Sequence, residues 1–357
     1  DEAAAVASAE RALELYPNSE VAFNRLLIAS IFGGDPTCDT CLPALNSVAL
    51  NPISVVALGN ASMIAARLGD MQESDRFITR MEQVEPNNIH SIYRRANWLE
   101  LQGRLADSLE LFLENEEHFP DALSVLGQMR APYYLGEGEA VGQLELHLAV
   151  HHLTTVGDFE MAESFLDLGI ERGGFGARYT FDSAAAELYS STGRYWEALD
   201  LLQPYEMMDP DQWGLHYTEQ GAYFCAMLSY YVRKELGKVD AGFWFEKLKR
   251  ACALRRQTPG LYRSFLPYCE AFIAQEEGRM EDAVSCLEEQ ETAEWVLCLY
   301  VAHHPMFAAL NAEPSAKPIL ARLDALILAE REKAESRGLL PLDKAKYDAF
   351  AERSYKD

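Results

Sequence analysis

The sequence has little positive charge and no long hydrophobic run. Its 357 residues include 31 Lys and Arg against 56 Asp and Glu, which gives a formal net charge of −25. A surface this acidic disfavours broad binding to nucleic acid or to anionic membranes. The longest uncharged stretch, residues 295–312, contains His303, His304 and Pro305. It does not fit a membrane span, which needs about 20 mainly apolar residues.

The motifs that identify the commonest enzyme classes are also missing. The sequence contains no P-loop, no dinucleotide-binding glycine fingerprint, no G-x-S-x-G elbow and no H-E-x-x-H zinc motif. Glycines cluster in LGEGEAVG, residues 135–142, but no predicted strand precedes them, so this segment is interpreted as a loop. We therefore expect a protein that is not an enzyme and needs no cofactor.

Cysteine is too scattered for a disulfide scaffold in a chain of this length. Of the seven cysteines, five lie in apolar helical patterns typical of small core residues: Cys225, Cys252, Cys269, Cys286 and Cys298. Cys38 and Cys41 form a C-x-x-C pair that has no second ligand pair for zinc. Three interpretations of this pair stay open: two ordinary cysteines, a local disulfide in an oxidising compartment, or a redox or metal role.

Proline and glycine, in contrast, recur with a period. Spacings of 35, 34 and 34 residues separate Pro17, Pro52, Pro86 and Pro120, and spacings of 35 and 34 separate Gly34, Gly69 and Gly103. Glycine can close one helix before the next begins, and proline ends the second helix. A 34-residue period with these breaks resembles the tetratricopeptide repeat, whose unit is helix, tight turn, helix.

The resemblance implies an all-α, right-handed superhelical solenoid of about seven hairpins with a C-terminal capping helix. Further turn glycines are Gly157, Gly193, Gly237 and Gly278, and small residues at the expected helix contacts are Ser74, Ser108, Ala162, Ala198 and Ala283. We divide the chain into a lone or truncated repeat helix (1–17), regular repeats (18–120), longer irregular repeats (121–294) and C-terminal capping helices with a tail (295–357). Because the first helix lacks its partner, we expect a fragment of a longer protein.

The tail carries a second resemblance. Helical spacing of Ile319, Leu320, Leu323, Leu326 and Ile327 predicts an amphipathic helix that caps the array. The segment HHPMFAALNAEPSAKPILARLD, residues 303–324, resembles the ending of repeat regions in bacterial signalling proteins that carry a class III adenylyl cyclase or winged-helix domain. This implies a sensor or interaction portion of such a regulator, either on the periplasmic side of a membrane-anchored parent or in the cytoplasm.

Counting from the turn glycines nominates side chains that line the concave groove of such an array. They are Asn24, Tyr93, Asn97, His147, His151, Glu187, Met227, Tyr231, Tyr268 and Phe272. Aromatic and amide groups suit an extended peptide or a partner helix. The predicted function is a non-enzymatic scaffold or sensor that binds a peptide or protein there, with a homo-oligomer as a further option and no nucleic-acid partner.

Two other features stay open as alternatives. His147 and His151 share one helix face and neighbour His152, so a small-ligand or metal-binding role is the alternative function, although we predict no metal. Residues 233–263 carry +6 while the rest of the chain carries −31. This basic island consists of Lys247, Lys249, Arg250, Arg255, Arg256 and Arg263, with interleaved aromatics. It either docks an acidic partner or acidic face of another copy, or is a solvated face that balances internal acids.

Overall fold

The computed structural model describes residues 2–16, 18–19, 21–23, 25–26, 41–67, 70–116, 126, 129–144, 146–172, 178–203, 219–257 and 266–354. Every regular element in these ranges is a helix, which confirms the predicted all-α repeat fold. The repeat helices are α1 (Glu2–Leu15), α3 (Cys41–Leu50), α4 (Val55–Arg67), α5 (Met71–Val84), α6 (Ile89–Leu101), α7 (Leu105–Asn115), α11 (Leu146–Thr155), α12 (Phe159–Arg172), α13 (Arg178–Ser191), α14 (Tyr195–Leu202), α15 (Glu219–Glu235), α16 (Ala241–Gln257), α17 (Leu266–Glu276) and α18 (Met280–Glu294).

Consecutive helices pack as hairpins: α4 with α5, α6 with α7, α11 with α12, α13 with α14, α15 with α16, and α17 with α18. The turn glycines have positive φ angles at Gly103 (72°), Gly157 (82°), Gly193 (79°), Gly237 (66°) and Gly278 (73°). In each turn the amide that follows the glycine donates to a carbonyl five residues earlier, as in Arg104 to Leu99 at 2.9 Å. The predicted role of glycine is confirmed at these turns, while Gly34 and Gly69 lie outside the described residues.

Small residues occupy the hairpin contacts as predicted. Ser74, Ser108, Ala162, Ala198 and Ala283 are all buried. Successive first helices also pack on one another: α4 on α6, α11 on α13, α13 on α15, and α15 on α17. These first helices therefore form two inner rows, one of α4 and α6 and one of α11, α13, α15 and α17, and in repeat arrays such rows line the concave side.

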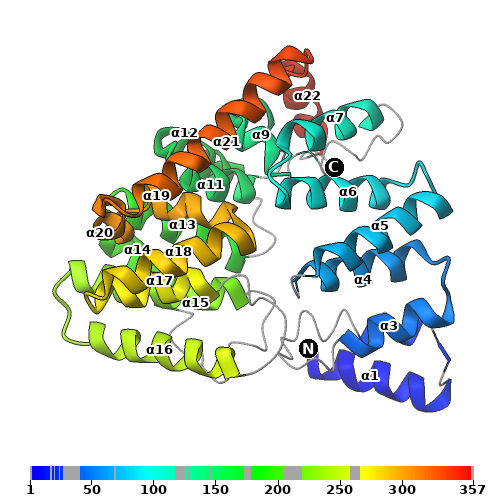
Figure 1. Ribbon diagram of the computed structural model, residues 1–357, viewed down its shortest axis with the longest axis horizontal. Helices are drawn as coiled ribbons and strands as arrows, with labels where there is room; N and C mark the ends of the chain where they lie inside the picture. The colour runs from blue at the N-terminus through cyan, green and yellow to red at the C-terminus, as the bar shows by residue number, and fades with distance from the viewer. Residues whose placement is uncertain are drawn as a thin grey trace.

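Two arms are visible in Figure 1, with α1 to α7 on the right and α11 to α20 on the left. A small hydrophobic core joins Val48 on α3 to Met81 on α5, and a much larger one extends from Ala96 on α6 to Ala351 near the C-terminal end of the described chain. The second arm and the tail thus share one core, and α6 and α7 belong to it.

The glycine-rich segment, residues 135–142, is helical in part, which corrects the expectation of a loop throughout. After the short helix α9 (Ala131–Tyr134) the chain turns at residues 135–137 and then forms the short helix α10 (Gly138–Val141). A Cβ atom on Gly142 would come within 2.3 Å of the Phe165 ring, and one on Gly138 within 2.7 Å of Leu153. These glycines therefore allow close packing of α10 on the second arm, a role that the glycine cluster alone did not indicate.

The C-terminal segment forms α19 (Val296–His303), the 3₁₀ helix η6 (Pro305–Phe307), α20 (Ala308–Ala312), α21 (Lys317–Ser336) and α22 (Lys344–Ser354). Helix α21 contains the predicted amphipathic pattern and buries Ile319 and Leu323. It packs on α18 and α19 and then continues to α7, while α22 packs on α10 (Figure 1). Leu326 lies within contact distance of the Gly103 turn. The return of the tail to the first arm was not predicted.

Candidate functional site

The predicted groove residues of the second arm all lie on inner-row helices. His151 belongs to α11, Glu187 to α13, Met227 and Tyr231 to α15, and Tyr268 and Phe272 to α17. Glu187, Met227, Tyr231, Tyr268 and Phe272 are buried, and only His151 is partly exposed. The structure therefore brings these residues together along one face, but in the interior of the molecule.

The chain's own residues 295–310 cover this face. The Tyr300 hydroxyl lies 2.8 Å from Nε2 of His151. The ring of Tyr231 lies 5.8 Å from that of His304, and the ring of Phe307 lies 5.1 Å from Tyr268. Since Phe307 and Leu310 are fully buried here, exposing each would cost about 1.5–3 kcal/mol. This half of the inner face is a core rather than an open binding surface.

A buried amide fixes the covering segment in place. The side chain of Gln275 on α17 donates to the carbonyl of Met306 at 2.7 Å and accepts from the amide of Leu310 at 2.9 Å. One side chain thus satisfies two backbone groups of η6 and α20, in the way that an inner-row amide would hold a bound peptide. The covering segment therefore occupies the position that the sequence predicted for a partner.

The histidine cluster is part of this interface. Nδ1 of His151 donates to the Glu187 carboxylate at 3.0 Å. Burial raises the pKa of Glu187, and the charge and hydrogen bond of His151 partly oppose that rise. His152 is buried and faces elsewhere, with Nδ1 at 3.4 Å from the Tyr134 hydroxyl. The His147 side chain lies outside the described residues.

Metal binding has little geometric support in this cluster. Where the chain is described, no group of three or more His, Cys, Asp or Glu side chains is placed to hold a metal ion. The rings of His151 and His152 are 5.2 Å apart and have different partners. The remaining carboxylate oxygen of Glu187 has no hydrogen-bond partner within the described protein. His151, through Glu187 and Tyr300, therefore links α11 to α13 and α19.

The first arm presents a different inner face. Tyr93 and Asn97 on α6 are half-buried, and the Arg94 guanidinium lies 5.7 Å from the centre of the Tyr93 ring. One repeat earlier, Met63 on α4 is also half-buried, and Val56 is 55% exposed. The helices that pack most extensively on α4 and α6 are their hairpin partners, α3 and each other. Asn24 lies outside the described residues.

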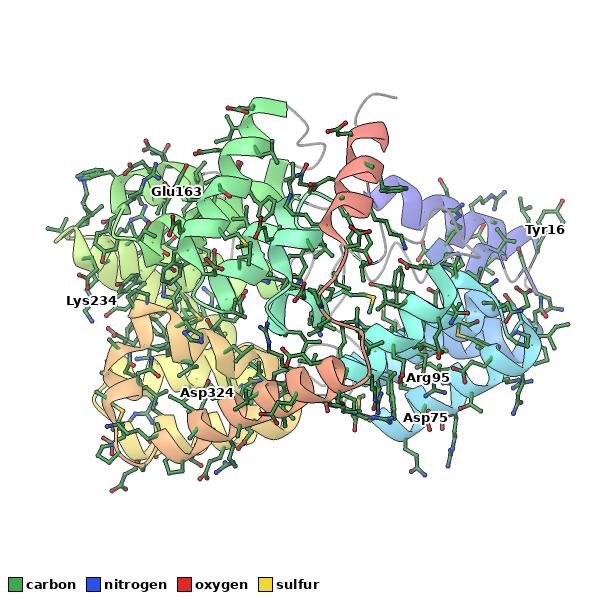
Figure 2. All side chains as sticks on the ribbon, turned by 90° about the horizontal axis from the view of Figure 1, so that it is seen from above. Tyr16, Asp75, Arg95, Glu163, Lys234 and Asp324 are labelled. Atoms are coloured by element: carbon green, nitrogen blue, oxygen red, sulfur yellow. The ribbon has the colours of Figure 1, made fainter. Side chains whose placement is uncertain are left out.

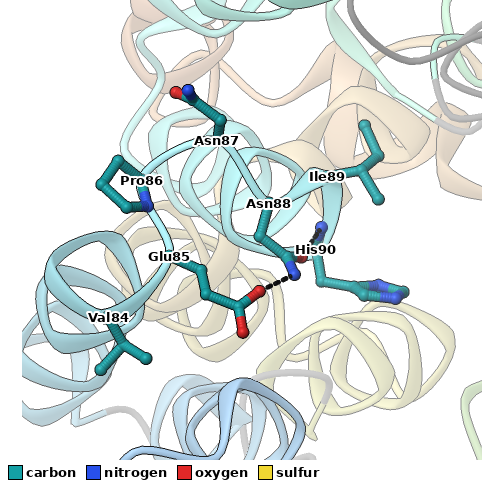
Figure 3. Close-up of a pocket in the computed structure, with 7 residues that line it drawn as sticks. All are labelled: Val84, Glu85, Pro86, Asn87, Asn88, Ile89 and His90. Carbon is teal, nitrogen blue, oxygen red and sulfur yellow. Dashed lines mark hydrogen bonds between the residues drawn. The ribbon is translucent and has the colours of Figure 1, made fainter.

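Among the described residues, the first arm has hollows at two places that bear on ligand binding. One, of about 620 Å³, is formed by the consecutive residues Val84 to His90, where Asn88 caps α6 by accepting from the amide of His90 at 2.8 Å (Figure 3). The other, of about 450 Å³, lies between α6, α7 and Arg337 at the end of α21. Its wall includes Arg95, which forms an ion pair with Asp75; both residues are labelled in Figure 2. The first follows one turn of chain and the second is lined by paired charges, so neither has the convergent groups of a ligand site.

Acids partly neutralise the predicted basic island. Lys249 lies 2.8 Å from Glu277, and Arg256 donates to Glu270 at 2.7 Å. The Lys247 amine lies over the Trp244 ring, 4.7 Å from its centre, and Arg250 is exposed. The Arg255 side chain and Arg263 lie outside the described residues.

The cysteines agree with the predicted core positions where they are described. Cys252, Cys269 and Cys298 are buried free thiols, and Cys286 is half-buried, as expected for core positions. The side chains of Cys38 and Cys41 lie outside the described residues.

Comparisons with known proteins assign no function to this geometry. No family profile and no curated relative matches the sequence. Among solved structures, the chain is similar to the Cut9 complex with Hcn1 (12% identity, 89% of this chain, 51% of that one, TM-score 0.42). It is also similar to human IFIT1 (16% identity, 91% of this chain, 68% of that one, TM-score 0.44). A third similar structure is yeast Tom70 (13% identity, 92% of this chain, 59% of that one, TM-score 0.34). The chain spans about half the length of the Cut9 structure's chain.

The hairpins themselves decide the architecture. The chain is an all-α array of tetratricopeptide-type hairpins. Its inner row is closed in the second arm by residues 295–310 and bears half-exposed side chains in the first. No described helix is both long and apolar enough to cross a membrane.

Proposed function

We propose that this protein is a non-enzymatic interaction module whose partner binds the inner face of α4 and α6, around Tyr93 and Asn97. One observation carries the proposal: residues 295–310 fill the corresponding face of the second arm, whereas Tyr93 and Asn97 remain partly exposed. Arrays of this type bind extended peptides or helices along their inner row.

The chemistry of this face favours a partner segment with both apolar and polar groups. Met63 and Val56 supply apolar contact, Tyr93 adds an aromatic ring, and Asn97 can donate to and accept from a peptide backbone. The cation over Tyr93 gives that ring a fixed orientation. A wider hypothesis, that the module regulates an attached signalling domain, rests on the resemblance of residues 303–324 to bacterial regulators.

Site-specific photo-crosslinking tests the proposed surface. A photoreactive phenylalanine analogue at Tyr93 should crosslink a partner in cells, and the same analogue at Arg80, exposed on the second helix α5, should not. The additional change Asn97→Ala should reduce the Tyr93 crosslink at least fivefold without lowering the melting temperature. Equal crosslinking from both positions, or crosslinking that Asn97→Ala leaves unchanged, would reject this face as the binding surface.

A further inference from the structure

Three large apolar side chains are exposed at one outer corner of the second arm. Trp196 in the first turn of α14 is 56% exposed, Val239 in the turn between α15 and α16 is fully exposed, and Phe243 in the first turn of α16 is 63% exposed. Single exposed apolar residues are ordinary, but a group of them indicates an interaction surface. Helix α16 lies at the bottom of the second arm as seen in Figure 1.

Contacts with lysine join these side chains into one patch. The Lys238 amine lies 4.2 Å from the centre of the Trp196 ring, and Val239 is its neighbour in sequence. The ring of Phe243 lies 5.8 Å from that of Trp244. Lys247 lies over both rings, 5.9 Å from the centre of Phe243. Helices α14 and α16 and the turn between α15 and α16 thus contribute to a single surface, which we call the Trp196 patch.

The charges around the patch favour an acidic partner. Three neighbouring acids already have cationic partners: Glu197 pairs with Arg194 at 3.2 Å, Asp240 with Arg233 at 3.0 Å and Glu246 with Lys249 at 3.3 Å. Lys238, in contrast, forms no ion pair with any residue that the structure describes and lies on an indole face. An ammonium has three N–H groups, so a lysine that contacts a ring face can also donate to a carboxylate.

We infer that the Trp196 patch docks an acidic peptide segment of a partner protein. An aliphatic or aromatic side chain of the segment packs on Trp196, Val239 and Phe243, and its carboxylates pair with Lys238 and Lys247. A second copy of the chain is a poorer occupant, because two molecules of net charge −25 repel each other. This surface faces outward and is separate from the inner face of α4 and α6, so either proposal can fail without the other.

A peptide-display library panned against the full chain tests the inference, with the double variant Trp196→Ala/Phe243→Ala as the counter-selection target. We expect enriched peptides that combine Asp or Glu with a large apolar residue. A synthetic copy of the most enriched peptide should bind the double variant at least tenfold more weakly than the wild type. Lys238→Gln/Lys247→Gln should weaken binding and reduce its dependence on salt.

The matched control is Ile170→Ala, because Ile170 on α12 is also 56% exposed but lies on another helix. It should bind the peptide like the wild type. Enrichment of basic peptides, or no enrichment over the counter-selection, would overturn the inference. Sedimentation that shows a dimer lost in the double variant would also overturn it, since the occupant would then be a second copy.

Discussion

His304 is held as a neutral imidazole because one of its ring nitrogens accepts a hydrogen bond and the other donates one. The amide of Met306 donates to Nδ1 at 3.2 Å, so Nε2 carries the proton and donates to the Ser190 hydroxyl at 3.1 Å. Burial lowers the pKa of His304 to about 3. Protonation of Nδ1 would replace the first hydrogen bond by a clash between two donors, so the interface of residues 295–310 requires the neutral form.

Acid should therefore weaken the fold through His304. An unfolded histidine has a pKa of about 6.5, so between that pH and about 3 the unfolded chain binds more protons. The stabilisation is complete above pH 6.5 and falls as pH decreases, by at most about 1.4 kcal/mol per pH unit. Urea unfolding between pH 7.5 and 4.5 should show a shallower decline in His304→Gln. Identical slopes in the two proteins would contradict this.

Gly142 and Gly242 form a matched pair for a packing test. Gly142 has an ordinary φ of −59°, but its Cβ would overlap the Phe165 ring, while nothing lies within 4 Å of a Cβ on Gly242. Gly142→Ala should lower the free energy of unfolding by about 1–3 kcal/mol through overpacking. Gly242→Ala should be neutral or stabilising by up to about 1 kcal/mol. Equal effects in thermal melts would exclude the close approach of α10 to α12.

Helix α21 completes the N-terminus of α7, an element whose own sequence provides no side-chain cap. The Glu330 carboxylate accepts from the amide of Ala106 at 2.8 Å, and negative charge is favourable at this end of a helix. Asp107 in the same turn lies 2.8 Å from both Lys333 and Arg337. Burial opposes ionisation of Asp107, but its hydrogen bonds to Lys333, Arg104 and Arg337 together hold its pKa well below the ordinary value.

Asp107→Asn should loosen the contact between α21 and α7 at neutral pH. Because the pKa of Asp107 is depressed, its contribution is present above the unfolded pKa of about 3.9 and is lost as pH falls further. We expect a loss of about 1 kcal/mol at pH 7, since the partners are partly exposed, and a smaller difference at pH 3. Hydrogen exchange of the α21 amides measures this loss of stability. A difference between the variant and the wild type that does not change with pH would contradict the role given to the Asp107 charge.

These elements show how far the sequence could lead. Spacing predicted the turn glycines, the small contact residues and the helix around Leu323, because each depends on local backbone geometry. It also placed His151, Glu187 and Tyr268 on one face. It could not show that Tyr300 and Phe307 cover that face, or that Leu326 meets Gly103, because these contacts join segments far apart in the chain. Periodicity carries no information on such pairings.

The two arms are connected at the top of the molecule as seen in Figure 1. The indole N–H of Trp295 donates to the carbonyl of Glu100 at 3.0 Å, and Arg331 donates to the carbonyl of Leu135 at 2.9 Å. Gln143 donates to Asp348 on α22 at 2.8 Å. Hydrogen bonds to backbone carbonyls and contacts with the tail thus fix the orientation of one arm relative to the other. Packing between neighbouring repeats alone would not fix it, because the row of repeats is interrupted at α9 and α10.

Weakening this connection should open the molecule. Leu326→Ala/Arg337→Ala removes the contact with the Gly103 turn and the ion pairs with α7. We expect a larger radius of gyration by small-angle scattering with unchanged helical content by circular dichroism. Leu328→Ala, at a position 57% exposed on the same helix, should scatter like the wild type. An unchanged radius in the double variant would show that α21 does not hold the arms together.

The covering of the second arm by residues 295–310 has a consequence during synthesis. The partners Glu100 and Trp295 are 195 residues apart, which corresponds to about 10–40 s at 5–20 residues per second. Until α19 emerges from the ribosome, the inner row made before it, which includes His151 and Tyr231, lacks the cover of residues 295–310, and such nascent apolar surfaces attract chaperones or aggregate. In an ordinary repeat array each repeat contacts only its neighbours, so stability is approximately a sum of terms from single repeats and their interfaces. Here a truncation before Trp295 would leave the inner face of the second arm uncovered, so we expect the array to reach its final packing only when its last helices arrive.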